Sequence, residues 1–263
     1  SAKSALLGCG YGLGWASFAA QLLVGFLGAP PVRYDKAFAK KLGVTMEYVE
    51  RFADWDENMQ KMAEIPHICT ESELLIHCVA AKKIIDIYRS TAHPVVSFWD
   101  MCTGLIQTSL YEGRVHHHKC LTFKKEAIEL PNGMHLRYPN LRREAQLTPD
   151  GKKMKDRQGN HIMNWVYGEE GVAPTKLYAG KVTNNVTQGL ARIVMTDGML
   201  RVAKRYPVVG TVHDEQIVCV PDEEVKDAKQ WVLDQMTVVP SYMPGIPLDA
   251  DGGAHRRYGL AKN

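Results

Sequence analysis

The clearest hydrophobic pattern in the chain is a pair of short arms near its carboxyl end. VVGTV (208–212) and QIVCV (216–220) are dominated by β-branched residues, which suit pleated, half-buried strands. His213, Asp214 and Glu215 lie between the arms, so the pattern predicts a hairpin that projects three polar side chains from a rigid scaffold. Adjacent acidic residues at a tight turn form a hard-oxygen site that suits Mg²⁺, although aspartate is also a favoured turn residue.

The stretch before this hairpin, residues 176–204, has the spacing of an amphipathic helix. Its apolar residues recur at near-helical intervals: Val182, Val186, Leu190, Ile193, Val194 and Leu200. Asn184, Gln188 and Arg192 stand at i, i+4 and i+8, and such residues share one face of a helix. We therefore expect these three side chains either to reach toward one ligand or to form a solvated face.

Further helices are predicted on both sides of this region. Between residues 30 and 113 the charged segments have apolar residues three and four apart, which favours helices. Glu71 and Glu73 open one of them, where the helix dipole favours acidic side chains, and Pro94 breaks the pair formed by this helix and the next one. Residues 222–236 predict another helix with an acidic start.

Strand patterns occupy the middle of the chain. From Cys120 the alternation in CLTFKKEAIEL, the turn PNG and the segment MHLRYP predict a β-hairpin. A second, polar hairpin is predicted over residues 150–168, punctuated by two X-Gly turns, and we expect it to be exposed. Together with the helices, these strands predict an α+β fold.

The amino-terminal stretch is uncharged over residues 4–32. That composition alone allows a transmembrane helix or a signal peptide. Glycines at positions 8, 10, 12 and 14 each cost about 1 kcal/mol in a helix interior relative to alanine, so the run needs packing or a ligand against it. A phosphate-binding loop is a weak alternative, because GCGYGLG fits neither the Rossmann nor the P-loop spacing.

Composition bounds the function. A chain of 263 residues with 45% hydrophobic content suits one large or two modest domains. A net charge of +3 argues against binding nucleic acid by bulk charge and leaves room for a local basic groove. The six cysteines show no CxxC spacing, which favours reduced thiols in a cytosolic setting. His116–His118 matches no common zinc-site spacing.

The predicted helix and hairpin together resemble the palm of family-A DNA polymerases, in which an N-x-x-x-Q helix precedes a V-H-D-E hairpin. The resemblance implies that Asn184 and Gln188, with Arg192 on the same face, contact primer and template. It implies that His213 contacts the primer terminus. Asp214 then corresponds to the metal-binding catalytic aspartate, with Glu215 beside it at the metals.

The first residues, SAKSALLGCGYGLG, resemble the O helix of the fingers in the same family, whose pattern is R-x-x-x-K, an aromatic residue and then Y-G. The resemblance implies a dNTP site in which Lys3 binds triphosphate oxygens, Leu7 contacts the sugar and Tyr11 stacks on the base. Glycines on the neighbouring face permit close approach of the nascent base pair. Leu7 replaces the usual Phe or Tyr, and the pattern's arginine would precede Ser1.

The resemblance runs over nearly all of the chain and implies most of a right-hand polymerase fold of the phage branch. Residues 1–117 would be helical fingers, with the O helix at 1–20. Residues 118–263 would form the β segment from fingers to palm and the antiparallel palm sheet with the catalytic hairpin, and would end in a strand and a Gly-rich tail. Met134 stands in place of an arginine of the family's L-P-S-G-R-x-L-x-Y-P segment, which weakens a template contact there.

A second aspartate, which the family carries on a D-[FY]-S-x-I-E strand before the O helix, does not occur in the sequence. Two-Mg²⁺ phosphoryl transfer needs carboxylates from both strands, so Asp214 would share one metal shell with a carboxylate from elsewhere. The expected partners are a DNA primer-template, dNTPs and an amino-terminal polypeptide with the remaining palm, the thumb and any exonuclease domain. A split gene, protein splicing or proteolysis would each produce this division within the O helix.

These observations predict a template-directed DNA polymerase that is active only with its amino-terminal part. The phage-like features place it in phage DNA replication, in the cytoplasm of a bacterial host and away from membranes. Two alternatives remain at this stage. One is a non-catalytic nucleic-acid-binding fragment that uses the same surfaces, and the other is a membrane protein with an amino-terminal span.

Overall fold

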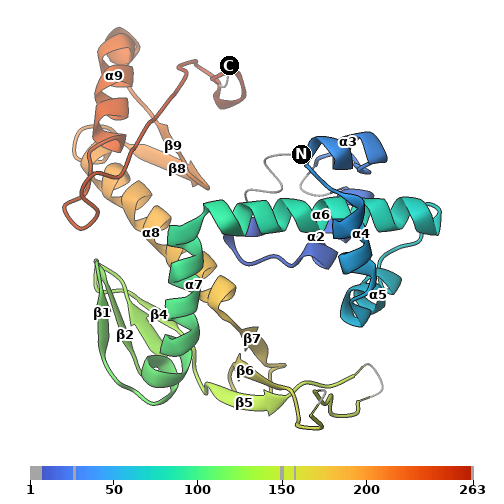
Figure 1. Cartoon of the computed structure of the whole chain (residues 1–263). Coiled ribbons are helices and arrows are strands. Elements are labelled where there is room, and N and C mark those ends of the chain that lie inside the picture. Colours follow the sequence, from blue (N-terminus) through green and yellow to red (C-terminus); the bar gives the residue numbers. More distant parts are fainter. Residues whose placement is uncertain (1–7, 26–27, 149–150, 157, 262–263) are drawn as a thin grey trace. The chain divides into compact units, whose positions relative to one another are not determined.

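The computed structural model of the chain describes residues 8–25, 28–148, 151–156 and 158–261. It divides into two compact units (Figure 1). Unit 1 comprises Ser1–Gly104 with Tyr178–Thr183, and unit 2 comprises Leu105–Leu177 with Asn184–Asn263. Helices occur in both units and antiparallel sheets in the second, so the predicted α+β class is confirmed.

Unit 1 is helical and is organised around one long helix. Its elements are α2 (Trp15–Val24), α3 (Lys36–Lys41), α4 (Met46–Ala53), α5 (Asp56–Ala63), α6 (Glu71–Thr91) and most of α7 (His93–Leu105). The core forms where α6 packs against α2, with Leu74, Val79 and Ala81 of α6 and Phe18 and Ala19 of α2 almost completely buried. The apolar spacing that predicted α6 therefore corresponds to its buried face.

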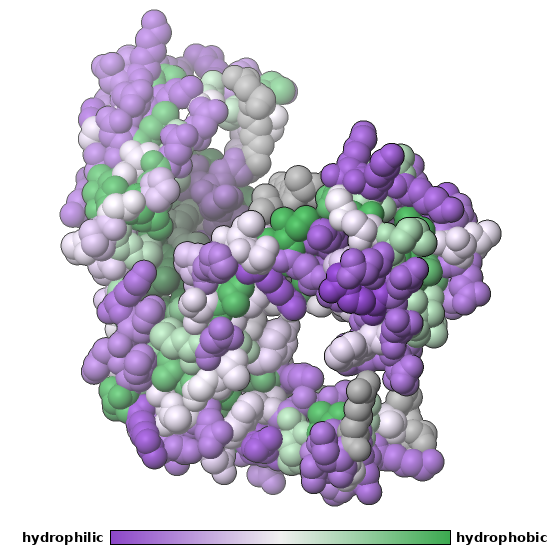
Figure 2. All heavy atoms as spheres, in the orientation of Figure 1, coloured by the Kyte–Doolittle hydropathy of each residue, from purple (hydrophilic) through white to green (hydrophobic). Residues whose placement is uncertain are grey.

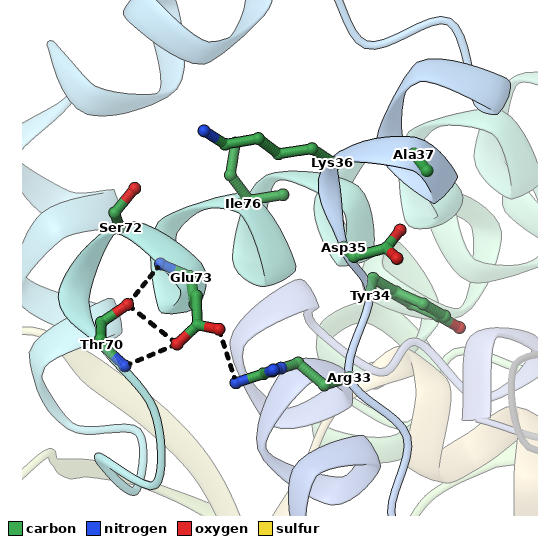
Figure 3. Close-up of a pocket in the computed structure, with 9 residues that line it drawn as sticks. All are labelled: Arg33, Tyr34, Asp35, Lys36, Ala37, Thr70, Ser72, Glu73 and Ile76. Carbon is green, nitrogen blue, oxygen red and sulfur yellow. Dashed lines mark hydrogen bonds and ion pairs between the residues drawn. The ribbon is translucent and has the colours of Figure 1, made fainter.

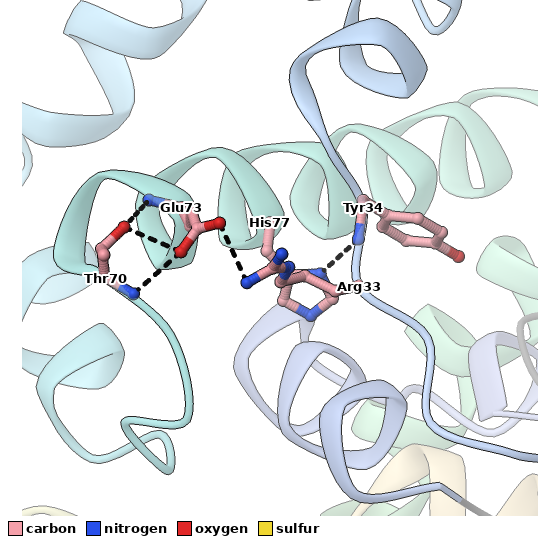
Figure 4. Close-up of polar contacts among 5 residues, drawn as sticks. All are labelled: Arg33, Tyr34, Thr70, Glu73 and His77. Carbon is pink, nitrogen blue, oxygen red and sulfur yellow. Dashed lines mark hydrogen bonds and ion pairs between the residues drawn. The ribbon is translucent and has the colours of Figure 1, made fainter.

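The ends of α6 follow from local side-chain chemistry. At its start the backbone N–H of Glu73 donates to Thr70 Oγ1 (3.4 Å), and the backbone N–H of Thr70 donates to the Glu73 carboxylate (3.0 Å; Figure 4). This reciprocal capping box satisfies two backbone donors that a helix start leaves free. The helix ends at Thr91 and α7 begins at His93, so the predicted break at Pro94 is confirmed.

His77, on the buried face of α6, is fully enclosed and fully hydrogen-bonded. The backbone N–H of Tyr34 donates to its Nδ1 (3.0 Å; Figure 4), so Nε2 carries the proton and donates to the Ala19 carbonyl (3.0 Å). Burial lowers the pKa of His77 below its usual value, and the nearby Arg33 acts in the same direction. The ring therefore links α2, α6 and the segment before α3 as a neutral imidazole.

We expect unit 1 to lose stability as the pH falls below about 6.5. Below that pH His77 becomes protonated in the unfolded chain. In the folded chain it stays neutral to a lower pH, because folding lowers the pKa of His77. The free energy of unfolding should fall by about 1.4 kcal/mol per pH unit until the folded-state pKa is reached. Urea unfolding between pH 8 and pH 5 measures this slope.

Two substitutions separate His77 from other titrating groups. In His77→Gln the amide can still accept from Tyr34 and donate to Ala19 but does not titrate, so the slope assigned to this residue should disappear. His67→Gln makes the same change at an exposed position and should leave the slope unchanged. A wild-type slope in the His77→Gln variant would contradict this account.

The described residues of unit 2 form three antiparallel sheets. The first joins β1 (His116–His118), β2 (Leu121–Lys124), β3 (Ala127–Glu129) and β4 (His135–Arg137) in that order, and the second joins β5 (Arg142–Ala145), β6 (Met163–Tyr167) and β7 (Thr175–Leu177). The third is the hairpin of β8 (Val208–Val212) and β9 (Glu215–Val218). The remaining elements are the π-helix η1 (Ile106–Tyr111), α8 (Ala179–Val202) from Asn184 onward, η2 (Asp222–Glu224), α9 (Val225–Met236) and η3 (Tyr258–Leu260).

Several sequence-based boundaries need correction. The strand expected over CLTFKKEAIEL is two strands, β2 and β3, because the chain turns at Lys125–Glu126 with φ of +52° at Glu126. The strand expected near the carboxyl end is absent from the described residues after Met236, where the short helix η3 is the regular element. The hairpin β3–β4 around Pro131–Gly133, α8 and the helix over residues 222–236 are confirmed.

The helix expected over residues 1–20 is interrupted. Residues 8–10 are helical, Tyr11 and Gly12 form a turn, and α2 begins only at Trp15. Gly12 has φ of +78°, a conformation that glycine adopts at little cost and that ends a right-handed helix. Within the described residues, no helix combines the length and the apolar character needed to cross a membrane.

All six cysteines are free thiols. Burial raises the pKa of Cys78 and of Cys102 to about 12 and also raises the pKa of Cys9. Because the thiolate is the reactive form, these three side chains are apolar packing groups rather than nucleophiles.

Candidate functional site

The β8–β9 hairpin places the acidic pair on a tight turn. Val212 pairs with Glu215, so His213 and Asp214 form a two-residue connection, and His213 has φ of +54°. Two-residue hairpin connections favour a positive φ at their first residue, and Lys119, Glu126 and Asn140 also have a positive φ. The predicted hairpin is confirmed, with an irregularity between Val208 and Gly210.

The side chains of His213 and Asp214 are exposed. In the part of the chain that the structure describes, no hydrogen bond or ion pair engages the Asp214 carboxylate. Glu215 differs, because it lies at the start of β9, is half-buried and accepts a hydrogen bond from the Tyr258 hydroxyl (3.3 Å). The tip therefore offers one unoccupied carboxylate next to one that the carboxyl-terminal segment restrains.

Gln216, the next residue of β9, was not predicted as a site residue from the sequence. Both polar atoms of its amide are buried, and neither has a hydrogen-bond partner among the described residues. Buried amides are nearly always paired, so an orphaned one beside Asp214 and Glu215 is an unusual feature of this hairpin. The burial of this amide could not be predicted from the sequence, because a Gln in a strand is usually a solvent-facing residue.

The predicted polar face of α8 is present. Asn184 is half-buried, while Gln188 and Arg192 are exposed, and all three belong to the part of α8 in unit 2. On the apolar side Val182, Val186 and Ile193 are buried as predicted. Leu200, expected in the core, is instead 56% exposed.

Contacts that the sequence did not suggest hold α8 against the first sheet. The Asn185 side-chain amide donates to the hydroxyl of the buried Tyr138 (3.1 Å). Gly189 lies so near the β3–β4 connection that an added Cβ would be 3.1 Å from Leu130. These contacts fix the rotation of the helix and hence the direction of its polar face within unit 2.

Of the three predicted dNTP-binding residues, Lys3 and Leu7 lie outside the described residues. Tyr11 is half-buried in the turn after residues 8–10, where its backbone N–H donates to the Gly8 carbonyl (3.2 Å). This turn lies directly against Gly180, in the first turn of α8, since a Cβ on Gly180 would stand 2.1 Å from Tyr11 O and 2.8 Å from Tyr11 C. The lack of a side chain at Gly180 thus allows the Tyr11 turn to lie against α8. In the sequence, the only sign of this contact is a glycine inside a helical pattern.

An open pocket of about 350 Å³ lies between the start of α3 and the start of α6 in unit 1 (Figure 3). Its carboxylates are already engaged: Asp35 accepts from the backbone N–H of Phe38 (2.7 Å), and Glu73 contacts Arg33 (3.0 Å) and Thr70. Hydrogen bonds from Thr70 hold the pKa of Glu73 below its usual value. These contacts cap helices, and they leave no reactive pair in the pocket.

Comparison with known proteins adds no relative: no family model, curated protein or solved structure matches the chain. Over the described residues, no three His, Cys, Asp or Glu side chains gather as a metal-binding group. The function of the site therefore has to be inferred from the chemistry of the hairpin and of the α8 face.

Proposed function

We propose that this chain is the carboxyl-terminal part of a family-A-like, template-directed DNA polymerase. The observation that carries the proposal is the two-residue turn at His213–Asp214, which presents an exposed, unengaged carboxylate beside Glu215. The same unit holds α8 with Asn184, Gln188 and Arg192 at helical spacing. The sequence pattern of a helix followed by a V-H-D-E hairpin resembles that of the polymerase palm, and the chain forms both a helix and a hairpin at these positions.

The residues present suit Mg²⁺, since hard carboxylate oxygens are its preferred protein ligands and it keeps the rest of its shell for water and phosphate. Asp214 would hold the ions, with Glu215 beside them, and a second aspartate would come from a segment that this sequence does not contain. Bound Mg²⁺ would supply activation of the primer 3′-hydroxyl and neutralisation of the triphosphate.

The chain's own residues would bind and orient the substrates. Asn184, Gln188 and Arg192 would contact primer and template along one face of α8, and His213 would contact the primer terminus. Lys3 would bind the triphosphate as a point charge, Leu7 would contact the sugar, and Tyr11 would stack on the incoming base. Holding the 3′-hydroxyl and the α-phosphate in line is the main contribution a protein makes to phosphoryl transfer.

Primer extension with the purified chain, alone and mixed with an amino-terminal polypeptide that carries the D-[FY]-S-x-I-E strand, tests the proposal. We expect no extension by the chain alone and Mg²⁺-dependent extension by the mixture. Extension by the chain alone would mean that another carboxylate, such as Asp54, Asp56 or Asp100, completes the site. Primer-template binding without extension by the mixture would instead identify a non-catalytic nucleic-acid-binding protein.

A further inference from the structure

Between β5 and β6 the chain forms a structured fork. The segments around Leu147 and Lys153, and around Lys155 and His161, pair as two short antiparallel bridges. At the base of the fork three backbone hydrogen bonds join Gln146, Met154 and Ile162 in a closed triangle (2.8, 2.8 and 3.0 Å). We call residues 142–148, 151–156 and 158–167, with β5 and β6 as its stem, the forked extension (Figure 1). It is a built element with a fixed register and not merely an exposed polar loop.

One face of the stem carries an aromatic and cationic cluster. Arg143 pairs with Trp165 across β5 and β6, so the two side chains lie on the same face. The Arg143 guanidinium lies over the Trp165 ring at 5.5 Å, and the Tyr111 ring from η1 lies 5.0 Å from it at 52°. Tyr111 is 47% exposed and Trp165 is half-buried. Solvent therefore reaches an aromatic surface that is held rigid from two sides.

The charges of the extension favour an anionic ligand. Arg143, Lys153 and Lys155 are exposed, and among the described residues none of them forms an ion pair with a carboxylate. Both carboxylates in the described part of the extension are engaged, because Glu144 pairs with Arg142 (2.7 Å) and Asp156 accepts backbone N–H groups of its own turn, from Gln158 and Asn160.

Two acidic residues that follow β6 lie away from the fork. Glu169 and Glu170 follow the Tyr167 end of β6, whereas the fork lies at its Met163 end. Hydrophilic residues predominate in the lower right of Figure 2, around a small hydrophobic area. Exposed Leu147 and Met163 add apolar surface between the ring cluster and the fork lysines.

We infer that the forked extension binds single-stranded nucleic acid. Unpaired bases would stack on Tyr111 and on the accessible part of Trp165, while Arg143, Lys153 and Lys155 contact phosphates. Base–aromatic stacking combined with backbone cations is the usual way in which proteins hold single strands without reading their sequence. A duplex would satisfy the cations but keep its base faces inside the stack, and an apolar protein segment would leave the cations without partners.

This site is separate from the hairpin and the α8 face, and it would operate whether or not the chain polymerises. Fluorescence anisotropy with the whole chain tests it, using a labelled oligothymidylate of about 20 nucleotides, longer than the roughly 4–16 nucleotides that single-strand-binding folds cover. A blunt duplex of equal length is the competitor. We expect the single strand to bind more tightly than the duplex.

Three variants resolve the contribution of each part. Tyr111→Ala should weaken binding of the oligothymidylate at least about fivefold, the lower end expected for loss of one stacked base. The double variant Lys153→Ala, Lys155→Ala should also weaken binding. It should make the slope of log K against log salt concentration shallower by about 1.4, because each phosphate contact on a single strand contributes roughly 0.7 to that slope. The matched control Lys226→Ala, Lys229→Ala removes two exposed charges from α9 and should leave affinity within about twofold of wild type.

Circular dichroism confirms that each variant is folded. Equal affinity for single strand and duplex, or wild-type affinity of both extension variants, would overturn the inference. Wild-type affinity of both variants is the result expected if the extension instead contacts another polypeptide.

Discussion

Replacing Asp214 with Asn should abolish nucleotide addition by the reconstituted polymerase while leaving primer-template binding nearly intact. The amide keeps the shape of the carboxylate and removes the charge that would hold Mg²⁺, a contribution worth several kcal/mol in the transition state. Because Asp214 is exposed and its carboxylate forms no hydrogen bond or ion pair with the described residues, the substitution should not disturb the hairpin. Single-turnover extension rates and anisotropy with labelled primer-template measure the two effects separately.

Asp227→Asn is the matched control, since it removes one exposed carboxylate from α9 in the same unit. Its cost should be limited to about 0.3–1 kcal/mol of helix stability near the α9 amino terminus, with the extension rate unchanged. If Asp214→Asn retained more than about a tenth of the wild-type rate, a loss of only ~1.4 kcal/mol, the assignment of Asp214 as metal ligand would be wrong.

The elements that the sequence predicted correctly are those whose signals are local. The β-branched arms of the β8–β9 hairpin, the acidic start of α6 and the break at Pro94 each depend on neighbouring residues. One error lies where a non-glycine residue takes a positive φ, at Glu126, which splits one predicted strand into two. Such a turn has no reliable sequence signature, because its conformation is imposed by the pairing of the strands around it.

The residues of the candidate site also separate into those with local sequence signals and those that depend on tertiary packing. The positions of His213, Asp214 and the α8 face follow from strand and helix periodicity, and the structure forms both elements. The roles of these residues in polymerisation come from the family resemblance and stay predictions. Contacts between distant segments, such as the buried amide of Gln216, the cluster of Tyr111 on Trp165 and the approach of Gly180 to Tyr11, could not be read from periodicity, because they depend on tertiary packing.

The Gly180 contact supports a prediction that runs against helix propensity. Alanine in place of a helical glycine ordinarily stabilises a protein by about 0.5–1 kcal/mol. At Gly180 the new Cβ would overlap the Tyr11 backbone, where the carbonyl oxygen is 2.1 Å away, so the turn or the first turn of α8 must move. Overpacking of this kind costs about 1–3 kcal/mol, and we expect Gly180→Ala to lower the free energy of unfolding of unit 1.

Gly104→Ala provides the matched control within the same unit. Gly104 also lies in a helix, α7, and an added Cβ there meets no atom within 4 Å, so this variant should be neutral or more stable than wild type. Urea unfolding should therefore shift in opposite directions for the two glycines, and amide hydrogen exchange at Tyr11 and Gly12 should accelerate only in Gly180→Ala. In the reconstituted polymerase the displaced turn should raise the KM for dNTP, because Tyr11 would no longer be held where it stacks on the incoming base. Stabilisation by both substitutions would show that the Tyr11 turn yields freely, and that Gly180 has no part in placing it.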